Sequence, residues 1–188
     1  DEAHSRGLKV ASHAHGTQGI INALHAGADT IEHASFIDEE GIRLAIANNA
    51  ALSMDIYVTE YILGEGAGAG ILEESLEKER MTGSTQRANF RKAVEAGATI
   101  VYGTDAGVYP HGQNAKQFSR MVRFGMTPLQ AIQSATVTAA DVMGLGYEVG
   151  KIEAGYAADL VAVKGNPLEN IELLEEPAAV IKGGVRYR

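Results

Sequence analysis

Residue types that bind metal ions stand at the ends of three short apolar runs in the sequence. His13 and His15 close the first run, His33 closes the second, and Asp105 follows a third after Gly-Thr. Imidazole and carboxylate groups are the ligands that a hydrolytic Zn²⁺ ion accepts. The pattern therefore predicts a metal site, provided that the fold brings these separate runs together.

Each of these residues alone also has an ordinary structural explanation. A single histidine at a strand end is more often a hydrogen-bonded structural residue, and Asp105 could cap a turn or the next helix. His13 and His15 lie two positions apart, so in a strand they share one face. However, the carboxyl ends of parallel strands meet at one edge of a sheet, where functional sites form. The coincidence at several strand ends therefore favours one shared site.

Other candidates carry less information. His111 lies on the loop after the run 99–102 and could contact substrate, although ordinary loop polarity explains it equally well. Tyr57 follows the apolar run 51–55 and could line a pocket, although a buried aromatic ring is equally common there. Residues 64–70 (GEGAGAG) lack the spacing of a dinucleotide fingerprint and the lysine of a P-loop, so we expect a mobile lid there. The charge run 73–80 (EESLEKER) is typical of a solvated helix face.

The elements that must position these residues alternate along the chain. Strands are predicted at residues 8–12, 30–33, 51–55 and 99–102. Helices are predicted at residues 19–25, 38–49, 84–96, 114–124 and 127–142, with a long connection over residues 56–81. Asp38 and Thr127 are suitable N-caps, and Pro128 suits a first helical turn. Strands that alternate with helices predict a parallel sheet in an α/β fold.

The pattern changes near residue 146. Residues 150–163 contain turns and a β-branched run, and residues 177–187 predict a hairpin that turns at Gly183-Gly184. We therefore expect residues 1–145 to carry the candidate site and residues 146–188 to form a small β segment. Four strand–helix units are half of an eight-fold barrel, which usually takes about 250 residues.

Composition excludes several classes of protein. The 188 residues include 16 Lys plus Arg against 24 Asp plus Glu, a net charge of −8 that argues against nucleic-acid and anionic-membrane binding. Cysteine is absent, which excludes disulfides and thiol catalysis and leaves the redox compartment open. The start, Asp1–Gly7, resembles the end of a helix, so we expect a chain that begins inside a larger protein, without its N-terminal targeting region, and favour the cytoplasm.

Five stretches give the chain a family resemblance. They are residues 10–16 (VASHAHG), 29–38 (DTIEHASFID), 102–112 (YGTDAGVYPHG), 125–145 and 150–168. In order and spacing the chain resembles the metal-dependent amidohydrolase superfamily, in its prolidase-like and imidazolonepropionase-like branch. The likeness extends over essentially the whole chain.

The resemblance implies a distorted (β/α)8 TIM-type barrel with a small β-sandwich. This chain would supply strands five to eight and a C-terminal segment of the sandwich. His13 and His33 would be the metal ligands of the fifth and sixth strands. Asp105, on the eighth strand, would bind metal and act as general base. His15 would lie near the site as a candidate substrate contact.

Two parts of the family site have no counterpart in this sequence. They are the HxH pair of the first strand and the carboxylated lysine of the fourth strand, which complete a binuclear centre in the whole enzyme, with zinc as the expected metal. The resemblance thus implies a partial sequence. Members of the family also often have an acidic residue where this chain has Lys116-Gln117, which affects the expected substrate contacts.

The leading functional prediction is hydrolysis of a carbon–nitrogen amide bond by metal-activated water, with Asp105 passing the proton to the departing amine. Dipeptides of the Xaa-Pro type, or with a cationic C-terminal residue, are the expected substrates. One alternative is a non-catalytic half-barrel that serves as a binding or assembly module, with an open sheet edge at each end that self-association into a homo-oligomer could cover. A deaminase or cyclic-amide hydrolase of the same superfamily is the other.

Overall fold

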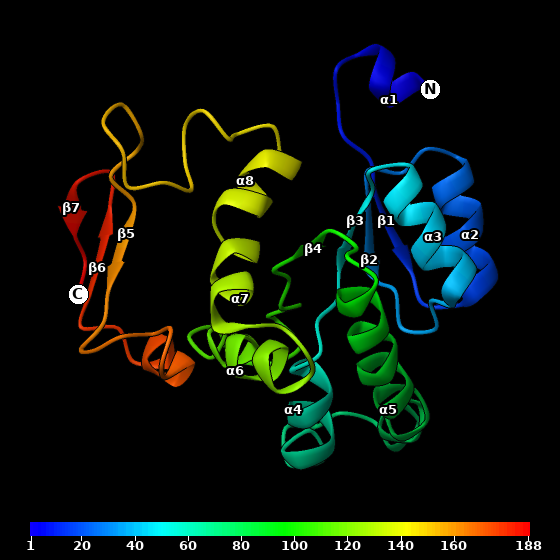
Figure 1. The fold of residues 1–188 in the computed structure, drawn as a ribbon. Helices are drawn as coiled ribbons and strands as arrows, with labels where there is room; N and C mark the ends of the chain where they lie inside the picture. The colour runs from blue at the N-terminus through cyan, green and yellow to red at the C-terminus, as the bar shows by residue number, and fades with distance from the viewer.

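The computed structural model describes residues 1–188 and contains two separate sheets (Figure 1). The first is parallel, in the order β1-β2-β3-β4, and consists of β1 (Ala11–Ala14), β2 (Thr30–His33), β3 (Ala51–Ser53) and β4 (Ile100–Val101). The second is antiparallel, in the order β5-β6-β7, and consists of β5 (Leu160–Ala162), β6 (Ala179–Lys182) and β7 (Val185–Arg186). The predicted α/β class, its parallel sheet and the hairpin at Gly183-Gly184 are confirmed.

Helices connect and cover the parallel sheet. They are α1 (Glu2–Ser5), α2 (Thr17–His25), α3 (Glu39–Ala47), α4 (Val58–Gly64), α5 (Glu73–Glu95), α6 (Lys116–Arg123), α7 (Pro128–Ser134) and α8 (Val137–Val142). A 3₁₀ helix, η1 (Ile171–Glu175), lies between β5 and β6. Figure 1 shows α2 and α3 side by side against one side of the parallel sheet, while β5, β6 and β7 stand apart from it.

The strand order determines where polar side chains can meet. All pairs in the first sheet are parallel, with Ala14 beside His33 and Ser53 beside Val101. The carboxyl ends of the strands therefore lie along one edge of the sheet, the end at which α4 follows β3 (Figure 1). The sheet is open, and β1 and β4 are its two edge strands. The open edges expected for a half-barrel are present.

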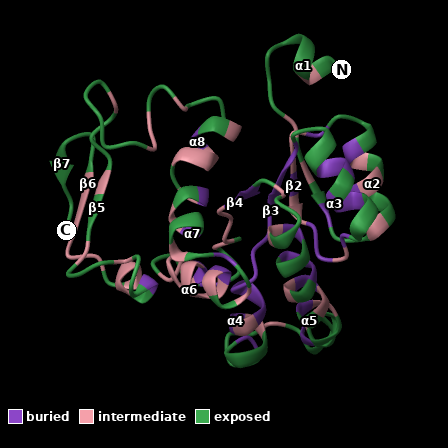
Figure 2. Ribbon diagram, in the orientation of Figure 1, coloured by how far each residue is buried: buried purple, intermediate pink, exposed green.

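One large apolar core holds the parallel sheet to its helices. Ile31 of β2 and Leu52 of β3 are fully buried against Leu24 of α2 and Phe90 of α5. Figure 2 shows buried residues concentrated in these strands and on the helix faces toward them, whereas the small sheet is half-buried or exposed. The well-packed part of the molecule is therefore the sheet that carries His13 and His33 and precedes Asp105.

Helix capping agrees with the sequence predictions. The Asp38 carboxylate accepts a 2.8 Å hydrogen bond from the Gly41 N–H at the start of α3. Thr127 forms a capping box with Gln130 at the start of α7, where Pro128 takes the first turn. Each cap satisfies backbone N–H groups that the helix itself leaves without partners.

The predicted long connection over residues 56–81 is wrong in part, because it contains α4 and the beginning of α5. The charge run forms the first turns of α5, with Lys78 paired to Glu74 at 2.9 Å and Arg80 to Glu73 at 2.8 Å. Leu76, one turn after Glu73 on the same helix, is buried. These features explain why the helix begins at Glu73 instead of near residue 84.

Two further boundaries differ from the predictions. His13 lies inside β1 and not beyond its end. The single helix predicted over residues 127–142 is divided into α7 and α8 at Thr136, whose φ of −125° and ψ of −100° are not helical. The segment 64–70 is folded into turns, in which the Gly66 N–H donates to the Ile62 carbonyl at 3.1 Å. Its motion as a lid stays a prediction. No helix has the length and apolar character needed to cross a membrane.

Asp29 ties the chain that enters β1 to the start of β2, and this tie should depend on pH. Its carboxylate accepts from Val10 N (2.7 Å), His4 (2.8 Å) and Lys9 (3.3 Å). Burial opposes ionisation, but these hydrogen bonds outweigh it and lower the pKa of Asp29 to about 2. The stabilisation is complete above the unfolded pKa of about 4 and is lost as pH falls toward 2.

We expect Asp29→Asn to lower the melting temperature by roughly 2–4 °C near neutral pH, equivalent to about 1 kcal/mol. The difference from the unchanged chain should shrink below about pH 4. Thermal unfolding followed by circular dichroism at several pH values measures it, with the exposed Glu77→Gln as control. A deficit that is the same at every pH would contradict the assigned role of the ionised carboxylate.

Candidate metal centre

Five side chains converge at the carboxyl edge of the parallel sheet. Nitrogen atoms of His13, His15 and His33 lie within 4.8 Å of one another. Ligand atoms of His33, Asp55 and Asp105 form a second group within the same limit. Because His33 belongs to both groups, we treat all five residues as one donor cluster. His13 and His33 thus share one group and His33 and Asp105 share the other, and binding of a metal ion by these three residues stays a prediction.

Strand pairing and unusual backbone conformations direct these side chains. The imidazole ring centroids of His13 and His33, on adjacent strands, lie 4.5 Å apart. His33 has a φ of +68° and Asp105 a φ of +49°, in the left-handed region. That region costs a non-glycine residue about 1–2 kcal/mol. Residues held in such conformations are concentrated at functional sites.

His15 joins the donor cluster more closely than the sequence indicated. Its Nδ1 lies 2.9 Å from the hydroxyl of the buried Ser35, which fixes the ring, and its ring stacks on His33 with centroids 4.5 Å apart. Burial and the neighbouring His33 and His13 lower the pKa of His15. A neutral imidazole keeps a lone pair for a metal ion. His15 is thus placed as a third nitrogen donor, besides being a candidate substrate contact.

Two carboxylates on neighbouring strand ends complete the donor cluster. Burial raises the pKa of Asp105, and the nearby negative charge of Asp55 raises it further. A divalent cation between imidazoles and paired carboxylates would relieve this repulsion, and both donor types suit Zn²⁺. The chemistry of the residues therefore fits a metal ion.

Sequence reasoning missed Asp55. Asp55 lies two residues beyond the end of β3 at Ser53. Its Oδ1 accepts a 3.0 Å hydrogen bond from Nδ1 of His33. That hydrogen bond raises the pKa of His33 against the opposing effect of burial. The criterion that selected His33 and Asp105, a ligand-type residue at a strand end, would have selected Asp55 as well.

The two weaker predictions fall outside the donor cluster. Tyr57 is buried, its hydroxyl donates to Gln113 at 3.0 Å, and its ring packs against Tyr109 with centroids 5.1 Å apart. His111 is exposed on the loop between β4 and α6 and belongs to neither ligand group. Tyr57 packs among neighbouring side chains, and substrate contacts by Tyr57 and by His111 stay predictions.

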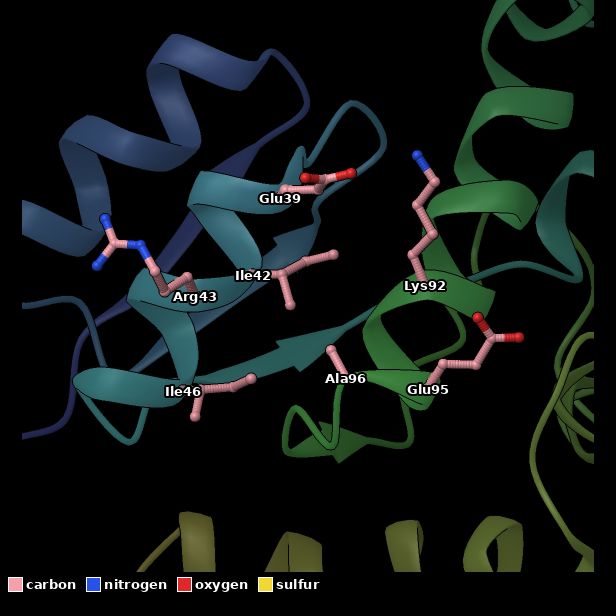
Figure 3. Close-up of a pocket in the computed structure, with 7 residues that line it drawn as sticks. All are labelled: Glu39, Ile42, Arg43, Ile46, Lys92, Glu95 and Ala96. Atoms are coloured by element: carbon pink, nitrogen blue, oxygen red, sulfur yellow. The ribbon is translucent and has the colours of Figure 1, made fainter.

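A groove of about 510 Å³ lies between α3 and α5, away from the donor cluster (Figure 3). It is lined by Glu39, Ile42, Arg43, Ile46, Lys92, Glu95 and Ala96. Figure 3 shows Ile42 and Ile46 on α3 and Lys92 and Glu95 on α5. A neighbouring hollow of about 500 Å³ shares Glu39 and Lys92. Neither shares a residue with the donor cluster.

Fold and donor cluster together define an α/β protein with a candidate metal centre at the carboxyl edge of a parallel sheet. The model of the amidohydrolase family matches residues 1–186. The chain therefore belongs to the amidohydrolase family.

Individual relatives agree with this assignment. A solved structure of a Xaa-Pro dipeptidase with methionine bound in its active site is 42% identical, with a TM-score of 0.92, over 99% of this chain and 46% of that one. Ochratoxinase from Aspergillus niger is 35% identical over all of this chain and 40% of its own length. An imidazolonepropionase from a Geobacillus strain is 29% identical over 76% of this chain and 30% of its own. The predicted branch is confirmed, and the chain spans less than half the length of these relatives.

Proposed function

We propose that the chain is the catalytic portion of a metal-dependent amidohydrolase that cleaves carbon–nitrogen amide bonds in small substrates. The observation that carries this proposal is the donor cluster of three imidazoles and two carboxylates at the carboxyl edge of the sheet. We further propose that residues 1–145 correspond to strands five to eight of a (β/α)8 barrel, and that residues 146–188 contribute to a β-sandwich. The open edges of β1 and β4 support the barrel proposal.

His13, His33 and Asp105 would hold a divalent cation, with His15 as a further nitrogen donor. Zn²⁺ is favoured because most of the donors are imidazole nitrogens. A bound cation of this kind polarises a carbonyl and makes a coordinated water more acidic. A carboxylate oxygen of Asp105 then accepts the proton of the attacking water and delivers it to the nitrogen of the departing amine. As ligands of a cation, His13 and His33 would be neutral imidazoles, because each would bind through a ring lone pair.

A dipeptide, in particular of the Xaa-Pro type, is the proposed substrate. The name of the similar Xaa-Pro dipeptidase supports this class. The similarity to ochratoxinase and to imidazolonepropionase keeps other amides and cyclic amides among the candidates. Neither a nucleic acid nor a membrane is part of this proposal, in keeping with the net charge of −8.

The experiment that tests this function is a metal-dependent hydrolysis screen. The longest native polypeptide that contains this chain is loaded with Zn²⁺ and offered Ala-Pro, Ala-Arg, an N-acyl amino acid and a cyclic amide. We expect release of free amino acids from at least one dipeptide, measured by mass spectrometry, and loss of this release after chelation. Ammonia release or ring opening alone would favour the deaminase or cyclic-amide alternative.

A binding or assembly module is the second candidate, because the structure leaves apolar surface exposed. Besides the two open sheet edges, Val161 and Val185 of the small sheet are 59% and 58% exposed. Self-association into a homo-oligomer would cover such surface. Absence of both bound metal and metal-dependent hydrolysis, together with a stable oligomer in sedimentation measurements, would favour this candidate over the enzyme.

A further inference from the structure

Asp55 differs from the rest of the donor cluster in its burial and in its hydrogen bonds. It is the one member of the cluster that is buried. Its Oδ1 accepts from His33 Nδ1 at 3.0 Å and from Gln86 Nε2 at 3.2 Å. A carboxylate oxygen that already accepts two hydrogen bonds has both lone-pair directions occupied. This oxygen is therefore directed at protein donors and not at a cation.

Gln86 connects Asp55 to the backbone of His33. It lies on α5 and is 4% exposed. Its Nε2 lies 3.4 Å from the His33 carbonyl oxygen in addition to 3.2 Å from the Asp55 carboxylate. The Asp55 carboxylate thus contacts the His33 side chain, and the Gln86 amide contacts both that carboxylate and the His33 backbone.

Gln117, on α6, holds the backbone on both sides of Asp55. Its side chain is fully buried. The amide Oε1 accepts from the Tyr57 N–H at 2.8 Å, and Nε2 donates to the Met54 carbonyl at 2.8 Å. Asp55 lies between these two residues in the chain, so its position is fixed through its backbone as well as through its side chain.

We propose that Asp55 is a positioning residue, which orients the His33 imidazole and keeps its hydrogen on Nδ1. The lone pair then lies on Nε2, the nitrogen left for a cation. Histidines that bind metals commonly donate their second N–H to a carboxylate in this way. The tautomer is a property of the metal-free chain, whereas its use in metal binding rests on the proposed function.

The tautomer is measured directly by NMR on the metal-free chain labelled with ¹⁵N-histidine, at a pH where His33 is neutral. The His33 signals are assigned from their loss in His33→Gln. We expect the Nδ1–H form in the unchanged chain and in Asp55→Asn, which keeps an acceptor oxygen. Asp55→Ala should shift His33 toward the Nε2–H form that free histidine favours. An Nε2–H form in the unchanged chain would overturn the proposal, even if Asp55→Ala does not fold.

Metal titration gives the second readout, with Zn²⁺ for affinity and Co²⁺ for its absorption spectrum. Asp55→Ala should bind Zn²⁺ about 10- to 100-fold more weakly with unchanged stoichiometry. Asp55→Asn should lose only a few-fold, and the control Glu77→Gln nothing. Equal affinity in Asp55→Ala would overturn the role, and a changed Co²⁺ coordination in Asp55→Asn would make Asp55 a ligand instead. If the longest native polypeptide that contains this chain binds no metal, the proposed function fails, while the NMR result still decides the role of Asp55.

Discussion

Asp105→Asn is expected to reduce the turnover of amide hydrolysis by about 10²- to 10⁴-fold, the usual contribution of a general base. The asparagine has nearly the same shape, so the left-handed backbone at this position and the other four donors should stay in place. What it loses is the ability to accept the proton of the attacking water. Steady-state rates on the best dipeptide, in the longest native polypeptide that contains the chain, measure the effect.

The metal content of this variant must be measured alongside its rate, because Asp105 is also a proposed ligand. Excess Zn²⁺ should restore occupancy without restoring the rate. Glu77→Gln is the matched control, since it removes one exposed carboxylate and should leave the rate unchanged. Near-normal turnover in the metal-loaded Asp105→Asn variant would show that Asp105 is not the general base.

Gln117→Leu is expected to lower the free energy of unfolding by about 2–6 kcal/mol. The leucine fills the buried space but leaves the Met54 carbonyl and the Tyr57 N–H without their 2.8 Å partners. Each buried backbone group that loses its partner costs about 1–3 kcal/mol. Urea unfolding followed by circular dichroism measures the change.

Two other substitutions make this result specific. Gln18→Leu removes an exposed glutamine of α2, bonded only to Asn22, and should change stability by less than about 0.5 kcal/mol. Gln117→Glu should also be less stable than the unchanged chain, because a buried carboxylate can accept from Tyr57 but places an acceptor and a charge against the Met54 carbonyl. If Gln117→Leu is no less stable than Gln18→Leu, the buried amide does not hold this loop.

Much of the fold could be predicted because its boundaries are set locally. The limits of β2 match the sequence prediction, since a short apolar run after a glycine turn specifies it. Asp38 and Thr127 mark helix starts through side-chain hydrogen bonds to nearby backbone. In contrast, α4 has no clear apolar period, and its position depends on tertiary packing of Tyr57 and Tyr61 against Tyr109. Such contacts cannot be derived from neighbouring residues in the chain.

The candidate site, like the fold, could be predicted from the sequence only in part. His13, His33 and Asp105 could be found because parallel strands must end at one edge of the sheet. The residues that support them come from distant helices. Gln86 and Asp55 are 31 positions apart, and Gln117 and Met54 are 63 apart. Only the lateral placement of α5 and α6 brings these amides to the strand end, and no local pattern encodes it.

The buried amide of Gln117 also has a consequence for protein engineering. It stands near the start of α6, directly after the loop that carries Asp105, yet both of its hydrogen bonds are made to the loop that carries Asp55. The two loops are thus joined by the hydrogen bonds of Gln117. A loop graft intended to change specificity has to transplant residues 54–57 together with residues 103–117, because exchanging either alone would misalign the carboxylate of the other.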